Sequence, residues 1–446
     1  MKRALWCLAW LSVVALRAGA QVQEVSFDDP VEITSTTPVA VESIHVSGDA
    51  PFDVALAAHV YAEGGGFNHD RYTIGICKGS ATGAFVGSTL WRPGDKTVAR
   101  GPYESDTIAV TGFEANVSGS ATYVLCVSKF NADAPDLTLY PRGINATQAP
   151  AGTSLRGFEV TDFDSGVTLT STSLASFGSL VVDAAIASDV LLTAHVRLEA
   201  PGFGGGYGYD FGICRGDASG PMVGRALLRP PSSADGSANQ ADQITLTGFD
   251  PGVFGPVTYV LCGGKSQVGA PNVSVSSRGM HAVAAPAGST LFGSEQVAVL
   301  PSFGLLDSIE PLSSVTVTGD GVYSVRLTGH VYLEGSAFDG GSRYAIGICR
   351  NDENGPLVGY TYWRPNTRTT DNAYVGDTLA LTGYDAHRSG TTTYVLCAGN
   401  RDYSAPTATA FMRGLVAQVP DPGGALAFAT GASALAALRA ARSRRA

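Results

Sequence analysis

Charged residues are scarce in this sequence of 446 residues, where Asp, Glu, Lys and Arg together account for 15 %. Helical periodicity is absent outside the two ends of the chain, which argues against a helical fold. Glycine is abundant, at 55 residues, and Ser, Thr and Val are frequent. This composition is typical of strands joined by glycine-rich turns. We therefore predict an all-β protein, and the length suggests roughly two to four domains.

Common catalytic motifs are also missing. The sequence has no GxSxG nucleophile elbow, no HExxH zinc motif and no phosphate-binding Walker motif. These absences argue against the serine hydrolases, zinc proteases and nucleotide-binding enzymes that carry such motifs. We predict no catalytic residues, no metal site and no cofactor.

Positive charge is concentrated at the two ends. The formal net charge is −10, yet residues 1–20 and residues 419–446 each carry +3, so the part between them carries −16. An acidic body of this kind argues against nucleic acids and anionic surfaces as partners.

The N-terminal 20 residues have the pattern of a secretory signal peptide. Lys2 and Arg3 precede an apolar run from Ala4 to Leu16, and Ala18-Gly19-Ala20 provides small residues for cleavage. The run is too short for a comfortable membrane-spanning helix, which needs about 20 residues. We predict an N-terminal signal helix and export from the cytoplasm.

The C-terminal segment, residues 419–446, has the pattern of a second targeting signal. Pro420-Asp421-Pro422 is followed by an apolar run from Gly423 to Leu438 and then by a cluster of four arginines. This arrangement resembles the PEP-CTERM sorting signal of Gram-negative bacteria. The resemblance covers only this segment, and Asp421 stands where the family usually has Glu.

The resemblance implies transient membrane insertion of a C-terminal apolar helix, with the arginines on the cytoplasmic side. It also implies processing by an exosortase and a link to exopolysaccharide and biofilm matrix. The alternative for the same segment is an ordinary, weak membrane anchor, because the apolar run is shorter than the about 20 residues of a full span.

Self-similarity organises the rest of the chain. His59-Val60 recurs at His195-Val196 and His330-Val331, with steps of 136 and 135 residues. Four further landmarks recur in the same order: GIC, TGF or TGY, YVLC and RG. The period is that of a domain, so we predict three tandem homologous domains at 21–149, 150–286 and 287–418, arranged as separate units on a string.

Each repeat has the pattern of a β-sandwich. In the first, residues 54, 56, 58, 60 and 62 are apolar and alternate with residues that we expect to face solvent, which predicts a strand with one buried face. Other β-like runs end at Cys77 or cover residues 31–34, 41–46, 85–91, 106–111, 122–127 and 137–140. Seven or eight strands in about 130 residues are typical of a sandwich.

Six of the seven cysteines fall in the repeats, two in each, and Cys7 lies in the predicted signal peptide. Six cysteines allow 15 pairings, but the repetition favours one bond within each repeat. Two cysteines and one histidine per repeat, without a CxxC motif, are too few for a tetrahedral zinc site. We predict the disulfides Cys77–Cys126, Cys214–Cys262 and Cys349–Cys397.

One histidine and one glutamate recur four residues apart in every repeat, as His59/Glu63, His195/Glu199 and His330/Glu334. Four residues along a strand span about 13 Å, which is too far for a direct pair or a shared metal ion. The favoured interpretation is a structural hydrogen bond, repeated because the domain is repeated.

Trp91-Arg92-Pro93 and Trp363-Arg364-Pro365 are candidates for ligand binding, because an indole can stack on a sugar ring while the arginine binds its hydroxyls. The second repeat has Leu228 in place of tryptophan. The competing interpretation is an indole that packs in the sandwich.

Other repeated or variable features carry weaker predictions. Arg142, Arg278 and Arg413 close the repeats and are expected to be buried against a carboxylate. The loops 64–72, 202–209 and 335–344 vary between repeats and are where recognition would lie. Asp70 and Asp339 form no recurrent pattern of oxygen ligands, so calcium binding has little support.

These observations favour a non-catalytic exported or cell-surface protein, structural or adhesive, associated with extracellular matrix. The alternatives are a carbohydrate-binding array and, with less support, a secreted hydrolase. The partners implied are the export machinery, an exosortase and a polysaccharide.

Overall fold

The computed structural model describes residues 23–26, 29–67, 70–93, 104–163, 166–201, 207–229, 239–296, 303–305, 309–335, 342–365, 375–400 and 406–420. The predicted signal peptide and residues 421–446 of the predicted sorting segment lie outside these ranges. Within them, no helix has the length and apolar character required to cross a membrane.

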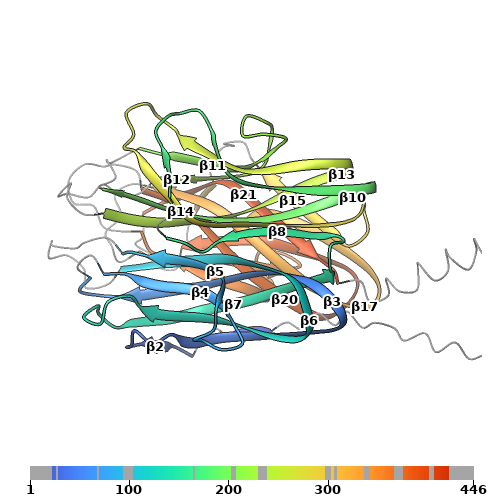
Figure 1. Ribbon diagram of the computed structural model, residues 1–446, viewed down its shortest axis with the longest axis horizontal. Coiled ribbons are helices and arrows are strands. Elements are labelled where there is room, and N and C mark those ends of the chain that lie inside the picture. Colours follow the sequence, from blue (N-terminus) through green and yellow to red (C-terminus); the bar gives the residue numbers. More distant parts are fainter. Residues whose placement is uncertain are drawn as a thin grey trace, which may run out of the picture.

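The described chain is all-β, as predicted, and forms three seven-stranded antiparallel sheets (Figure 1). The first sheet contains β1 (Gln23–Ser26), β2 (Val31–Ile33), β3 (Val39–Gly64), β4 (Tyr72–Lys78), β5 (Phe85–Trp91), β6 (Glu104–Lys129) and β7 (Leu137–Pro150). The second contains β8 (Leu155–Val160), β9 (Val167–Leu169), β10 (Ala175–Pro201), β11 (Tyr209–Arg215), β12 (Met222–Leu228), β13 (Asn239–Lys265) and β14 (Val273–Pro286). The third contains β15 (Leu291–Gln296), β16 (Phe303–Leu305), β17 (Glu310–Gly335), β18 (Tyr344–Arg350), β19 (Leu357–Trp363), β20 (Val375–Asn400) and β21 (Ala408–Gln418).

The three sheets share one strand order. The first runs β1-β7-β3-β6-β4-β5, with β2 also paired to β7, and the other two repeat this order with their own strands. No strand is exchanged between sheets among the described residues. Each sheet therefore corresponds to one sequence repeat.

Two strands of each sheet are much longer than the sequence pattern indicates. β3 and β6 each span 26 residues and pair with each other along most of that length. The register shifts between Gly48 and Phe52 and between Phe52 and Val54. Such bulges bend a strand without ending it, so the runs predicted as separate strands at 41–46 and 54–62 are two arms of β3.

Because β3 and β6 bend, each sheet encloses a hydrophobic core of its own. The residues that alternate at 54, 56, 58, 60 and 62 are all buried in the first core, as predicted. Equivalent clusters fill the second and third repeats. The structure is thus consistent with three β-sandwich-like domains.

The three predicted disulfides are present, and each joins the fourth strand of its repeat to the sixth. The bonded Cα atoms are 6.0 to 6.2 Å apart. The cysteine sulfurs are buried, so these bonds are structural.

The prediction about the opposite face of β3 is wrong. Ala55, His59, Tyr61 and Glu63 were expected to face solvent, but all four side chains are buried. They are covered by a neighbouring repeat, because this face of each sheet is turned toward the other two repeats. The three domains are therefore packed together rather than spaced along a string, and Figure 1 shows the third repeat, in orange and red, lying next to both others.

The connections between repeats are fixed as well as short. The carboxylate of Asp53 accepts hydrogen bonds from the backbone N–H groups of Asn116 and Gly152, at 2.9 and 2.8 Å. The carboxylate of Asp189 likewise accepts hydrogen bonds from the backbone N–H groups of Gly252 and Gly288. Gly152 and Gly288 both have φ of 71°, a left-handed conformation that glycine adopts without steric cost.

Candidate functional site

The repeated histidines connect the repeats into a closed ring. His59 of the first repeat contacts Thr382 of the third, with 3.0 Å between Nδ1 and Oγ1. His195 of the second contacts Thr111 of the first at 2.7 Å, and His330 of the third contacts Thr247 of the second at 2.8 Å. Each repeat gives one histidine and one threonine, so the last repeat closes back on the first.

The hydrogen bonds define the protonation state of these histidines. In each case the threonine backbone N–H donates to Nδ1, at 3.1 to 3.2 Å. Because Nδ1 is the acceptor, the proton of the neutral ring is on Nε2, which donates to Tyr360 O in one repeat and Arg225 O in another. Burial lowers the pKa of His59 and His195 to about 3 and that of His330 to about 4.

Two glutamates complete this contact. The hydroxyl of Thr111 donates to Glu159 Oε1 at 2.7 Å, and the hydroxyl of Thr247 donates to Glu295. Burial raises the pKa of both carboxyl groups well above the ordinary value. These two glutamates were not predicted from the sequence, because each accepts from a threonine of the preceding repeat, Glu159 from Thr111 and Glu295 from Thr247.

A glutamate, a histidine and a hydroxyl in contact could be mistaken for a nucleophilic triad. Here the threonine N–H occupies Nδ1, and His59, His195 and His330 have no exposed surface. A general base needs a free lone pair within reach of the substrate. This arrangement is therefore the repeated structural hydrogen bond that the sequence predicted.

The repeated glutamates form a second ring of contacts. Arg364 of the third repeat pairs with Glu63 of the first at 3.0 Å, Arg92 of the first with Glu199 of the second at 3.3 Å, and Arg229 of the second with Glu334 of the third at 2.6 Å. Arg92 and Arg364, predicted to bind ligand hydroxyls, thus bind carboxylates of a neighbouring repeat.

The tryptophans do not form a platform for sugar rings. Trp91 and Trp363 are 4 % and 3 % exposed and belong to the cores of their own repeats, where Leu228 occupies the equivalent position in the second. Trp91 packs against Phe67 and Tyr72, with 5.7 Å between ring centroids in each pair. The ligand-binding prediction for these two residues is wrong because the rings point into the sandwich.

Three aspartates meet between the repeats. Asp106, Asp242 and Asp377 occupy equivalent positions, and one carboxylate oxygen from each lies within 4.8 Å of the others. Desolvation raises the pKa of Asp106 and Asp377 well above the ordinary value and that of Asp242 to about 6. Carboxylate oxygens are ligands for calcium or magnesium, so these residues are where the described part of the chain could hold a cation.

The remaining predicted residues have structural positions. Nε of Arg142, Arg278 and Arg413 donates to a backbone carbonyl oxygen, whereas a carboxylate partner was expected. Arg142 also has a carboxylate nearby, that of Glu42 at 4.0 Å. Asp70 is buried. Asp339 and most of the variable loop at 202–209 lie outside the described residues.

The comparisons with known proteins identify no family. No protein-family model matches the chain, and no curated protein matches it either. Among solved structures, PNGase F, a glycosylasparaginase from Flavobacterium meningosepticum, has 10 % identity and a TM-score of 0.32 over 59 % of this chain and 95 % of its own. A structure of PNGF-II has 8 % identity and a TM-score of 0.28 over 74 % of this chain and 78 % of its own.

A tandem CBM22 domain from Xyn10C of Paenibacillus barcinonensis has 12 % identity and a TM-score of 0.16, over 59 % of this chain and 92 % of its own. These similarities are too distant to support an argument about activity. The chain itself shows an all-β protein with three disulfides, which indicates an extracellular protein.

Proposed function

We propose that this protein is a non-catalytic structural module of the cell surface or extracellular matrix, delivered by its signal peptide and retained through its C-terminal segment. One observation carries the proposal. The histidine, the glutamate and the arginine that recur as His59, Glu63 and Arg92 and their equivalents are used to bind the repeats to one another.

An enzyme that had been triplicated would be expected to keep an acid and a base at an accessible position in at least one copy. The repeated histidines are fully buried, and each repeated glutamate pairs with an arginine of another repeat. The chemistry of the repeats therefore supports rigidity rather than turnover.

A matrix protein also benefits from resistance to unfolding and cleavage outside the cell. Each repeat carries one buried disulfide, and the linkers at Gly152 and Gly288 are hydrogen-bonded to aspartates. The PEP-CTERM-like segment supports attachment by an exosortase-dependent route. Polysaccharide is the expected partner of such a module.

The test is the location of the protein in cells that produce it. We expect the full chain in the cell-associated or matrix fraction, and a chain ending at Gln418 in the culture medium with the same fold and disulfides. Mass spectrometry of the mature protein should show the loss of residues 1–20 and of the arginine-rich end. Equal distribution of the two chains between matrix and medium would contradict the proposal.

Two assays on the purified protein separate the alternatives. Incubation with matrix polysaccharides should yield no new reducing ends, because no hydrolysis is expected; turnover would favour the hydrolase. A glycan array then tests the carbohydrate-binding alternative, which no longer has the tryptophan platform. Replacing Trp91 or Trp363 is unsuitable for that test, since both fill a core.

A further inference from the structure

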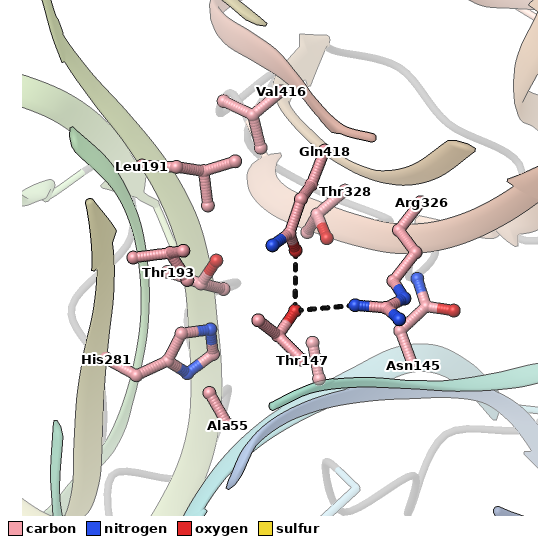
Figure 2. A pocket seen from close by; sticks show the side chains of 12 residues that line it. Ala55, Asn145, Thr147, Leu191, Thr193, His281, Arg326, Thr328, Val416 and Gln418 are labelled. Carbon is pink, nitrogen blue, oxygen red and sulfur yellow. Dashed lines mark hydrogen bonds between the residues drawn. The ribbon is translucent and has the colours of Figure 1, made fainter. Parts of the chain in front are cut away.

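A small cavity lies between the three repeats, and Figure 2 shows its lining. Its volume is about 30 Å³. Four equivalent positions from each repeat surround it, carried by β3 and β7 and by the strands that correspond to them. The lining residues are Ala55, Ala57, Asn145, Thr147, Leu191, Thr193, His281, Val283, Arg326, Thr328, Val416 and Gln418.

The equivalent positions hold different side chains, unlike the histidine and glutamate contacts. The position of Ala55 in the first repeat is Leu191 in the second and Arg326 in the third. The lining includes seven polar residues and no carboxylate. The cavity is therefore polar and positively charged, and this property belongs to the whole chain rather than to one repeat.

Arg326 is buried, at 5 % exposure, and its guanidinium is directed into the cavity (Figure 2). Nη1 donates to Thr147 Oγ1 at 3.2 Å, and Thr147 in turn donates to Gln418 Oε1 at 2.6 Å. The Nε and Nη2 atoms are buried and have no hydrogen-bond partner. Two donors of a buried cation are thus unsatisfied.

Among the residues that line the cavity, no acidic group is placed to neutralise this charge. Asp53 and Asp189 lie two residues along the strand from the lining residues Ala55 and Leu191, about 7 Å away. Each of these two carboxylates already accepts hydrogen bonds from two backbone N–H groups. An arginine stays protonated in proteins, and an uncompensated charge is costly to bury. The environment of Arg326 requires a counter-ion.

A second buried donor faces the same space. His281 lines the cavity, is 5 % exposed, and its Nδ1 atom has no hydrogen-bond partner. A neutral imidazole with its proton on Nδ1 would donate to an anion beside Arg326. The hydroxyl groups of Thr193 and Thr328 also line the cavity.

The volume limits what can bind. A water molecule needs a cavity of roughly 10–15 Å³ on this measure, so about 30 Å³ holds one or two particles of that size. Sulfate and phosphate are polyatomic and too large, whereas a halide ion is a single sphere. Water alone would satisfy hydrogen bonds but would leave the charge of Arg326 uncompensated.

We propose that this cavity binds one halide ion, chloride under ordinary conditions, held by Arg326 and His281 at the junction of the three repeats. The ion would join Arg326 of the third repeat to His281 of the second, while Arg326 also donates to Thr147 of the first, and it would so stabilise the association of the repeats. This inference is independent of the proposed function, because it concerns only how the folded body is held together.

The test is thermal unfolding of the purified protein after dialysis against sodium gluconate, with chloride or bromide then replacing gluconate at constant ionic strength. The midpoint temperature should rise by several degrees and saturate, because an ion that binds only the folded state stabilises it by mass action. Line broadening of the ³⁵Cl NMR signal, reversed by bromide, should report the same site.

Arg326→Leu is the matched variant, since leucine already occupies the equivalent position as Leu191. It should abolish both the chloride-dependent shift and the line broadening. Arg225→Leu is the control, because Arg225 lies outside the cavity and pairs with Asp210; it should keep both effects.

A crystal soaked in bromide provides the second measurement, which does not depend on the stability of a variant. Anomalous scattering beside Nε and Nη2 of Arg326 is the expected result. No anomalous peak there, a midpoint equal in gluconate and chloride, or a chloride effect that persists in Arg326→Leu would each overturn the proposal.

Discussion

At the scale of single residues, the histidines show what a repeated sequence can and cannot reveal. The repetition of His59, His195 and His330 correctly indicated a structural hydrogen bond. Alternation along one strand could not identify the partner, because the threonine lies in another repeat. The alternation of apolar and polar residues separates the two faces of a strand. It does not indicate whether the polar face contacts water or a second sheet.

Removing one of these histidines should weaken the whole molecule. In His330→Ala, the Thr247 N–H and the Arg225 carbonyl oxygen would lose a partner. We expect the free energy of unfolding to fall by about 2–4 kcal/mol, from unsatisfied polar groups and the space left behind. Urea unfolding measures this. The exposed His45→Ala is the control and should change stability by less than about 0.5 kcal/mol.

The same histidine predicts a pH dependence. Its pKa is about 4 in the folded protein and 6.5 as the ordinary value, so between these values the unfolded chain binds more protons. The contribution of His330 to the unfolding free energy therefore decreases as the pH falls from about 6.5 to 4.

His330→Gln isolates this contribution, because glutamine retains an acceptor for Thr247 and does not titrate. The slope of stability against pH should be smaller in the variant by up to about 1.4 kcal/mol per pH unit in that window. Carboxylates with raised pKa values oppose the trend equally in both proteins. Parallel curves for the two proteins would show that His330 is not neutral when folded.

At the scale of strands, the sequence predicted which segments form strands better than it predicted where those strands end. The strand at Phe85–Trp91 was predicted with its observed limits. The segments Gly48–Asp53 and Glu114–Gly119 contain the Gly, Pro and Asn residues that normally end strands, yet pairing continues past them through bulges and left-handed residues such as Asn116. Local turn signals cannot distinguish a chain that stops from one that bends.

The disulfides are the element whose prediction succeeded most fully, because repetition supplied the pairing that spacing alone could not. Replacing both Cys349 and Cys397 with alanine releases a loop of 48 residues. We expect a loss of about 2–4 kcal/mol in the unfolding free energy, measured by urea unfolding without reductant. The Cys214/Cys262 pair offers a replicate in another repeat, and no loss in either would show that these bonds do not limit stability.

At the scale of the whole molecule, the contacts follow a cyclic order that three separate chains could also adopt. Each repeat presents a histidine and a glutamate to one neighbour and a threonine and an arginine to the other. Closed rings form when one surface complements another with a fixed rotation. The sequence showed three copies but not this order, since no pattern within one copy names its neighbour.

The cyclic order predicts that the first repeat can associate with itself. In a fragment of residues 21–150, His59 would meet Thr111 of another copy, and Arg92 would meet Glu63. This repeat lines the cavity between the repeats with Ala55, Ala57, Asn145 and Thr147, which are small and uncharged. We expect a trimer at micromolar concentrations, detected by sedimentation equilibrium, and His59→Ala should shift it toward monomer.

The third repeat provides the contrasting case, because its trimer would place three copies of Arg326 around one cavity. Electrostatic repulsion in a buried site should keep a fragment of residues 287–420 monomeric, whereas the same fragment with Arg326→Leu should form trimers. A monomeric first repeat at all concentrations would mean that the linkers at Gly152 and Gly288, and not the histidine and arginine contacts, hold the ring together. Trimers of both unmodified fragments would mean that the charge of Arg326 in the cavity has no influence on assembly.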